Sequence, residues 1–150
     1  MADDIRISDD PAELDRDRIY RWIGEQSYWA KGRARERQEA AIDGSWNFGA
    51  YDSTTGEQLG FARLVTDRAT FAWLCDVFVD EGARGRRVGK SLMAAIAAAL
   101  DELGMPRTML ATADAHGLYA QYGFEPLAEP ERLMARIPNS SVSSARPSMG

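Results

Sequence analysis

The stretch ARGRRVGKS, residues 83–91, contains the residue types that most clearly suit ligand binding. It places four cations, Arg84, Arg86, Arg87 and Lys90, around two glycines in a chain whose net charge is −5. An apolar, strand-like run precedes it and a long helical pattern follows it. A turn from a strand into a helix presents backbone N–H groups and the positive end of the helix dipole to an anion. Cations there oppose that dipole unless an anion is bound, so the segment predicts a phosphate-binding turn.

One candidate ligand is a nucleoside triphosphate, because the segment ends in Gly-Lys-Ser. A P-loop needs a first glycine five residues before the glycine of its Gly-Lys pair. That position is Arg84, and the nearest glycine, Gly85, is one residue out of register. The spacing therefore argues against a triphosphate loop and favours another phosphate-bearing ligand.

The elements that hold this turn are predicted from the apolar periodicity. Apolar residues at steps of three and four from Val88 to Leu103 predict the strongest helix, and Gly104 ends it. Alternating or continuous apolar runs predict strands over 3–8, 45–52, 57–65, 69–80, 107–112 and 129–137. Further helices are predicted over 12–26, 33–43 and 114–123, the last with Asp114 as N-cap. This order predicts one α/β domain with a central sheet.

Composition limits the classes of function. The chain has 150 residues, 45% hydrophobic and 27% charged, which suits one soluble globular domain. The acidic balance argues against a nucleic-acid partner. A single cysteine, Cys75, excludes an intramolecular disulfide, and with a single histidine a zinc site is not expected.

We expect neither a signal peptide nor a membrane-spanning segment in this sequence. MADDIRISDD lacks the basic and apolar regions of a signal peptide, and the apolar run LMAAIAAAL is too short to span a bilayer. We therefore expect a cytoplasmic protein with no membrane partner. The Ser-rich residues 139–150 have little to bury and are expected to form a disordered tail.

Three segments together resemble the GNAT superfamily of acyl-CoA-dependent N-acyltransferases: LCDVFVD, ARGRRVGKSLM and, about thirty residues later, LYAQYGF. The family's pattern of Arg or Gln, two residues, Gly, one residue, then Gly or Ala falls on Arg84, Arg87 and Gly89. Arg87 departs from it, because the family usually has Gly there. The resemblance covers residues 45–127 and implies a GNAT-like domain over 1–138. Its fold class is α/β (α+β), with a central mixed, mostly antiparallel sheet flanked by helices.

The resemblance also implies acetyl-CoA as co-substrate, without a metal. The pantetheine arm would lie along Val77, Phe78 and Val79, where a backbone N–H near Phe78 or Val79 would stabilise the oxyanion. Thr112, where many relatives have Asn, and Ala115 would line the same arm. The pyrophosphate would lie on the backbone of Arg84, Gly85, Arg86, Arg87, Val88, Gly89 and Lys90.

Two side chains are candidates for proton transfer. By resemblance, Tyr119 would donate a proton to the leaving thiolate, and the alternative is a helical tyrosine packed on the sheet. Asp76, a carboxylate in an apolar strand, could be the base that deprotonates the amine. The alternative for Asp76 is a carboxylate paired with a neighbouring cation such as Arg63.

In this family the first helices and their loop cover the acceptor. The corresponding candidates are Tyr28 and Trp29 as an aromatic wall, Arg33 as a contact for a carboxylate, and His116 beside Tyr119 as a substrate contact or base. Each could instead be an ordinary surface or packing residue. The resemblance implies an N-acetyltransferase that acts on a primary amine of a small molecule. The alternative is a non-catalytic CoA-binding sensor or interaction module, and a homodimer is left open.

Overall fold

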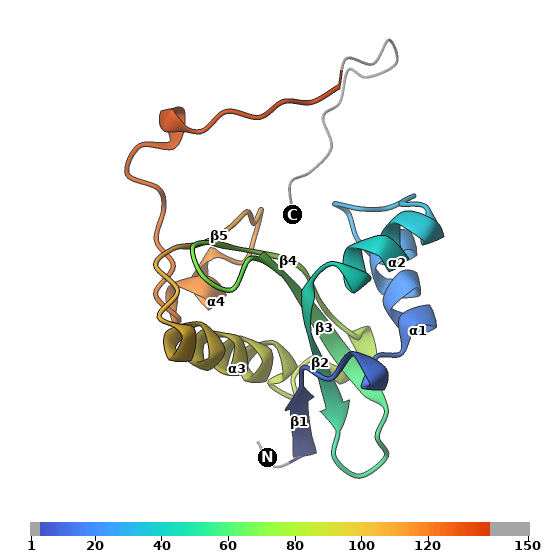
Figure 1. The fold of residues 1–150 in the computed structure, drawn as a ribbon. Helices are drawn as coiled ribbons and strands as arrows, with labels where there is room; N and C mark the ends of the chain where they lie inside the picture. Colours follow the sequence, from blue (N-terminus) through green and yellow to red (C-terminus); the bar gives the residue numbers. More distant parts are fainter. Residues whose placement is uncertain (1–3, 139–150) are drawn as a thin grey trace.

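The computed structural model describes residues 4–138, and the tail predicted to be disordered lies outside them (Figure 1). Five strands form one sheet in the order β1-β2-β3-β4-β5. β1 to β4 pair antiparallel with their neighbours, whereas β4 and β5 are parallel. The predicted mixed, mostly antiparallel sheet is thus confirmed. The strands are β1 (Ile5–Ser8), β2 (Trp46–Asp52), β3 (Gln58–Thr66), β4 (Ala72–Val79) and β5 (Thr108–Leu110).

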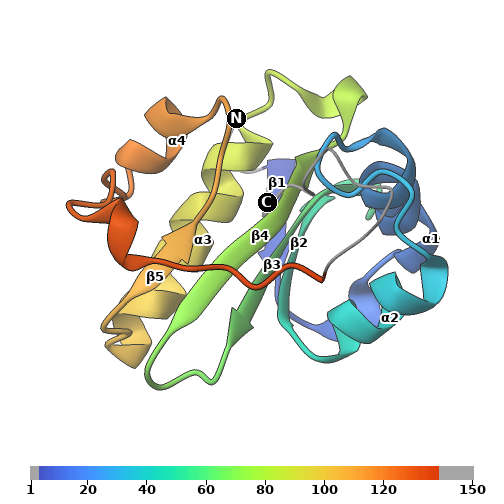
Figure 2. The same cartoon turned by 90° about the horizontal axis from the view of Figure 1, so that it is seen from above.

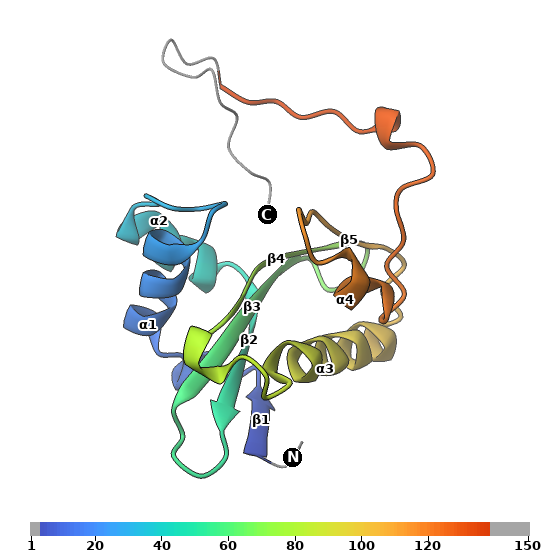
Figure 3. The same cartoon turned by 180° about the vertical axis from the view of Figure 1, so that it is seen from behind.

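Helices cover both faces of the sheet (Figures 1 and 3). α1 (Arg16–Tyr20) and α2 (Arg35–Asp43) lie on one face, and α3 (Val88–Leu103) and α4 (His116–Ala120) lie on the other. The larger apolar core lies between the sheet and α3, and the smaller one joins α1 and α2 to the sheet through Phe61. Both faces of the sheet are therefore buried, which explains the nearly continuous apolar runs of β3 and β4.

Two of the predicted helices differ from those in the structure, one in its continuity and the other in its N-cap residue. The helix predicted over 12–26 is divided, because Asp15 N-caps α1 through a bond from Arg18 N, and the π-helical turn Arg21–Gln26 follows α1. The N-cap predicted at Asp114 is wrong: the N-cap is Ala115, whose N–H donates to Thr112 Oγ1 at 3.0 Å. A hydroxyl three residues earlier thus organises the start of α4.

The strand predicted over 129–137 is not formed. A 3-10 turn, Pro130–Arg132, is followed by an extended run to residue 138 that stands clear of the sheet (Figures 1 and 3). Leu133, Ala135 and Ile137 have the alternation of a strand, but a strand also needs a neighbour to pair with. Within residues 4–138 no strand pairs with this run, so β5 is an edge strand.

Across the described part of the chain, none of the helices combines the length and apolarity needed to cross a bilayer. In the same residues, no three His, Cys, Asp or Glu side chains gather where they could hold a metal ion.

Candidate active site

The edge of β4 is open at its C-terminal half. β4 pairs with β5 only from Ala72 to Leu74, so residues 75–79 have no strand partner on that side within residues 4–138 (Figure 2). Asp80, which directly follows β4, donates its N–H to Leu59 O of β3 at 2.8 Å, so Asp80 and Leu59 form a hydrogen-bonded pair of the ladder. Because such pairs alternate along an antiparallel ladder, the N–H and C=O of Val79 point away from β3, toward the open edge. The Phe78 N–H points toward β3.

A β-bulge lies in the middle of this open half. Phe61 is opposite Phe78 and Arg63 is opposite Cys75, so two β4 residues, Asp76 and Val77, face the single residue between them on β3. Asp76 has a φ of 53°, in the left-handed region. A bulge of this kind bends the strand and redirects its side chains and backbone groups. It therefore redirects Val77–Val79 relative to the residues of β4 that pair with β5.

The N-terminus of α3 lies at the end of the open edge. No side chain of the described residues caps this helix, and its first turn contains no acidic residue. A Cβ built on Gly89 would lie 3.8 Å from Val79 and 3.9 Å from Leu118 of α4, so β4, α3 and α4 meet there. Gly60 on β3 permits this approach, because a Cβ there would lie 2.8 Å from the side chain of Val88. The free N–H groups of the first turn are suited to an anion.

The cations of the turn have different tasks. Arg86 donates to Asp52 Oδ2 at 3.1 Å and thereby ties the turn to the β2–β3 hairpin. Arg84, Arg87 and Lys90 are exposed and form no ion pair with any residue of the described chain. Three free positive charges thus surround the uncapped helix end, which fits a diphosphate better than a neutral ligand.

Arg87 occupies a backbone position that favours glycine. Its φ is 64° and its ψ is 27°, a left-handed conformation immediately before α3. A non-glycine residue pays about 1–2 kcal/mol there, which explains on physical grounds why the GNAT pattern usually has Gly.

We expect Arg87→Gly to raise the free energy of unfolding by about 1 kcal/mol, because it removes that backbone strain. Arg84→Gly is the matched control, since Arg84 has an ordinary extended conformation (φ −64°). It should leave stability unchanged or slightly reduced. Urea unfolding of both variants checks this, and equal effects at the two positions would contradict the assignment of strain to Arg87.

Asp76 is the centre of a buried polar cluster. Its side chain is almost fully buried, at 1% exposure. Oδ1 accepts from Trp29 Nε1 at 2.9 Å, and Oδ2 accepts from Arg33 Nη1 at 2.8 Å and from Arg63 Nε at 3.0 Å. Arg63, which the sequence analysis considered as a partner of Asp76, is therefore one of three donors to its carboxylate.

This cluster disfavours Asp76 as the general base. Burial acts to raise the pKa of Asp76, but the opposing effects of the hydrogen bond from Arg33 and the charges of Arg63 and Arg33 prevail and lower it. A carboxylate with a lowered pKa is a poor proton acceptor. The geometry favours a structural task, in which Asp76 fixes Trp29 and the loop before α2 against β4.

Tyr119 lies on α4, next to the open edge. It is 9% exposed, and its ring packs edge-on against Phe124 at a centroid distance of 6.0 Å. Burial first, and then Tyr28 and Asp114, raise the pKa of Tyr119 to about 12. The phenol therefore keeps its proton at neutral pH and is available as a donor.

The four acceptor candidates separate into an aromatic pair, Trp29 and Tyr28, and two polar side chains, Arg33 and His116. Trp29 is fixed by Asp76 and contacts Phe78 of β4 at a ring distance of 6.4 Å, whereas Tyr28 is 61% exposed and touches the edge of Trp29. Both follow the π-helical turn and lie outside any helix. Arg33 is engaged by Asp76 and Gln38, and His116 is exposed beside Tyr119 on α4. Trp29 and Tyr28 thus form an aromatic surface next to β4, and Arg33 binds the same carboxylate, Asp76, that holds Trp29 in place.

Sequence reasoning missed several residues of this arrangement. Gln38 of α2 and Ser45 before β2 bind the two arginines, and Trp22 stacks on Phe78 at 5.8 Å. These residues come from segments far apart in the chain, so spacing alone gave no signal for them. The sequence offered one signal for this buried cluster, which was the single carboxylate Asp76 within an apolar strand.

Comparison with known proteins agrees with this geometry. Residues 44–126 match the family model described as acetyltransferase (GNAT) domain. A solved structure from Xanthomonas campestris pv. campestris, described as an acetyltransferase belonging to the GNAT family, is 44% identical, with a TM-score of 0.84 over 89% of this chain and 93% of that chain. Comparison with curated protein sequences gave no match.

More distant structures share the fold. Glucosamine-6-phosphate N-acetyltransferase from Arabidopsis thaliana is 12% identical, with a TM-score of 0.61 over 91% of this chain and 98% of that chain. IAA acetyltransferase from Bacillus cereus is 17% identical, with a TM-score of 0.62 over 83% and 79%. The family model, the 44% identical structure and the open β4 edge lead to one conclusion: this chain belongs to the GNAT family of acetyltransferases.

Proposed function

We propose that the protein transfers an acetyl group from acetyl-CoA to a primary amine of a small molecule, by direct attack of the amine on the thioester. The observation that carries this proposal is the meeting of an open strand edge, an uncapped helix N-terminus and a protonated tyrosine at one place. Membership of the GNAT family supports the acetyl transfer. The amine as acceptor is our inference.

The chain's own groups fit the two polar parts of the co-substrate. The free N–H groups of Val88, Gly89 and Lys90 would bind the diphosphate, with Arg84 and Arg87 adding charge and Arg86 holding the turn in place. The open edge of β4 offers backbone donors and acceptors to an extended chain with amides, as an added strand would use them. Acetyl-CoA supplies an activated acyl group and a thiolate leaving group.

The Val79 N–H is the oxyanion donor that we propose. Of the two backbone donors predicted from the sequence, it is the one that the ladder leaves on the open edge, since the Phe78 N–H points toward β3. A donor fixed in a sheet needs no reorganisation when negative charge develops on the carbonyl oxygen. The pairing of β4 with β3 therefore fixes the orientation of the Val79 N–H before acetyl-CoA binds.

The proton balance follows from Tyr119. The amine must be neutral to attack and loses a proton after attack, and the departing sulfur gains one. Tyr119 is the donor that we propose for the sulfur, because it lies on α4 where α4 meets β4 and α3, and because its phenol, with a pKa raised to about 12, is protonated at neutral pH. We propose no side-chain base on Asp76; a water that passes the amine proton to bulk solvent would suffice for an acceptor that is partly neutral at the working pH. The Tyr119 oxygen takes a proton back from solvent before the next turnover, so the amine loses one proton and the sulfur gains one.

The test is release of free CoA thiol from acetyl-CoA in the presence of a panel of small primary amines. We expect release that depends on the amine, with the acetylated amine identified by mass spectrometry. A folded protein that binds acetyl-CoA but releases no thiol with any amine would support the alternative, a non-catalytic CoA-binding module. Transfer to a hydroxyl compound alone would contradict the amine as acceptor.

A further inference from the structure

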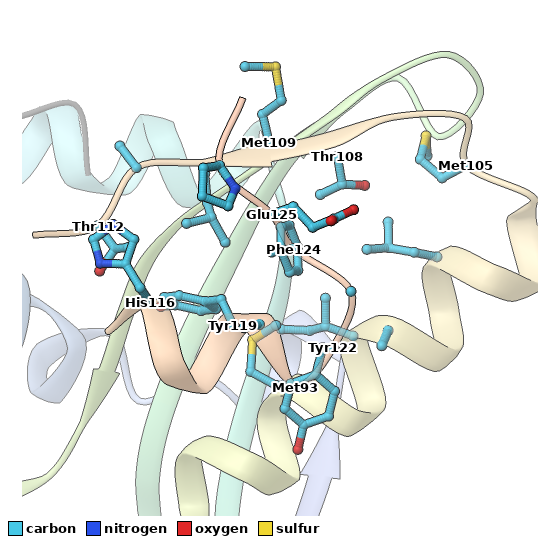
Figure 4. A pocket seen from close by; sticks show the side chains of 18 of the residues that line it. Met93, Met105, Thr108, Met109, Thr112, His116, Tyr119, Tyr122, Phe124 and Glu125 are labelled. Carbon is cyan, nitrogen blue, oxygen red and sulfur yellow. The ribbon is translucent and has the colours of Figure 1, made fainter. Parts of the chain in front are cut away.

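A cavity of about 700 Å³ lies beneath β5, between that strand and the helices α3 and α4 (Figure 4). Met93 and Ile96 line it from α3, and Leu110 and Phe124 line it from β5 and from the segment after α4. Small-molecule sites have volumes of about 300–1,000 Å³ and are lined mainly by apolar side chains with a few polar groups. The cavity therefore has the size and the lining of a ligand site.

The charges in the lining limit the kind of ligand. Its acidic residues are Asp101 and Glu125, and none of the described residues that line it is Lys or Arg. A carboxylate or a phosphate inside the cavity would meet like charges without a cationic partner, which costs free energy. The part of a ligand that lies in this cavity is therefore neutral and apolar.

The cavity adjoins the candidate active site at one end. Its lining includes Thr112, a candidate for contact with the pantetheine arm, and Tyr119, the donor that we propose for the sulfur. On α3 the lining begins at Met93, about one helical turn after Gly89. Figure 4 shows Thr112 at one end of the cavity, on the side of Tyr119, and Met105 at the other end. The cavity thus leads away from the place that we assign to the thioester.

The strand pairing directs a longer acyl chain toward this cavity. The edge of β4 is open over residues 75–79, but at Leu74 it is occupied by Leu110 of β5. A chain that extends from the thioester along this edge cannot continue in the plane of the sheet, so it must leave on one of the two faces. Trp29 and Phe78 pack on the face of α1 and α2, where the acceptor candidates lie. The cavity lies on the other face, so the acyl chain and the amine would occupy opposite faces of the sheet.

We propose that the cavity holds the acyl chain of acyl-CoA thioesters longer than acetyl-CoA, so that the protein also transfers medium-length acyl groups such as octanoyl. This inference rests on the proposed function and widens its donor class. The amine nitrogen bonds to the carbonyl carbon, the C–S bond breaks, the sulfur takes the proton of Tyr119, and the amine loses one proton to water. Solvent returns a proton to the Tyr119 oxygen, and the chain itself undergoes no chemical change.

The dimensions of the cavity suit a chain of medium length. Met93 and Leu100 both line it, and the rise of α3 between them is about 10 Å. Methionine side chains are unbranched and flexible, so Met93 and Met105 can adapt to chains of different length. Each methylene buried there should tighten binding about fourfold. After the cost of ordering the chain, we expect octanoyl-CoA to bind about 100-fold more tightly than acetyl-CoA.

The first test is calorimetry with acetyl-CoA and octanoyl-CoA in the absence of an amine, which measures affinity without turnover. The expected result is the 100-fold preference for octanoyl-CoA, and equal affinities would overturn the inference. Free octanoate should not compete with octanoyl-CoA, because its carboxylate would lie beside Asp101 and Glu125. Octanoate that binds as tightly as octanoyl-CoA would overturn the thioester as the occupant.

Variants that fill the cavity test where the chain binds. Ala97→Phe on α3 introduces a ring into the lining at a partly exposed position, and Ala120→Phe on α4 does so from the other side. Each should lower the ratio of octanoyl-CoA to acetyl-CoA affinity by about tenfold or more. Ala98→Phe is the matched control, because Ala98 is exposed on α3 and lies outside the lining. It should keep the wild-type ratio, and equal ratios in filling and control variants that urea unfolding shows to be folded would contradict the cavity as the binding site.

Turnover separates this inference from the proposed function. Thiol release and mass spectrometry with the amine panel are repeated with octanoyl-CoA, and we expect the octanoyl amide at a kcat/KM no lower than that for acetyl transfer. Acetyl transfer without tighter binding of octanoyl-CoA would overturn the cavity inference alone. Tighter binding of octanoyl-CoA without thiol release from either thioester would support the cavity as a chain site and contradict the proposed function.

Discussion

Replacing Tyr119 by Phe is expected to lower kcat for acetyl transfer by about 100-fold or more, the range found for loss of a general acid. The phenol is buried, its pKa is raised to about 12, and it therefore donates rather than accepts a proton at neutral pH. Since the proton is delivered as the sulfur departs, kcat and kcat/KM should fall together while the affinity for acetyl-CoA stays unchanged. Steady-state kinetics and calorimetry measure these two quantities.

Tyr122→Phe is the matched control for this prediction. Tyr122 stands three residues further on, and its hydroxyl donates to Lys90 O at 3.1 Å rather than lying buried beside Phe124. Its loss should cost about 1 kcal/mol of stability and leave kcat within a few-fold of the wild type. If Tyr119→Phe retained wild-type kcat, the thiolate would have to leave without this donor, and the proposed role of Tyr119 would be wrong.

Replacing Asp76 by Ala is expected to destabilise the fold by about 3 kcal/mol, because two largely buried arginines lose their shared partner. The side chains of Arg33 and Arg63 are only 18% and 12% exposed, so water cannot replace the carboxylate. Trp29 loses its acceptor in the same variant. Urea unfolding measures the change.

The control for Asp76→Ala is Asp17→Ala. Asp17 also pairs with an arginine, Arg35 at 2.7 Å, but its side chain is 75% exposed. Exposed pairs contribute little, so no resolvable change in stability is expected there. Equal effects of the two substitutions would contradict the buried cluster as a source of stability.

Asp76→Asn separates the structural role from a catalytic one. The folded pKa of Asp76 lies below its ordinary value of 3.8, so its charge stabilises the fold above about pH 4, and this contribution is lost as the pH falls through the folded pKa. The Asn variant should therefore show lower stability at neutral pH and a shallower loss toward acid. Its KM for the amine should rise more than its kcat falls. A selective loss of kcat, with stability intact and the acidic limb of the pH profile removed, would instead identify Asp76 as the base.

The cofactor side of the site could be predicted from local sequence. The spacing of Arg84 and Gly89 between an apolar strand and a strongly periodic helix located the turn that we propose for the diphosphate, and β4 and α3 formed within a few residues of their predicted bounds. Such features depend on neighbours in the chain, which a sequence displays directly. The left-handed backbone at Arg87 gives a physical reason why the family pattern usually has Gly there, which the sequence alone did not supply.

The acceptor side could not be predicted in the same way. The pairing of Asp76 with Arg63 was an alternative that the sequence offered, but Trp29 and Arg33 reach Asp76 through tertiary packing across 47 and 43 residues, which no local pattern encodes. The segment after Pro130 shows a different limit. Its residues alternate as in a strand, but this alternation does not say whether a neighbouring strand is available to pair with it.

A crystal structure with acetyl-CoA bound tests the central claim most directly. The diphosphate oxygens should lie within hydrogen-bond distance of the N–H groups of Val88, Gly89 and Lys90, and the thioester should lie between the backbone of Val79 and the hydroxyl of Tyr119. Acetyl-CoA bound away from the open edge of β4, or anywhere that leaves the N-terminus of α3 free, would contradict the account.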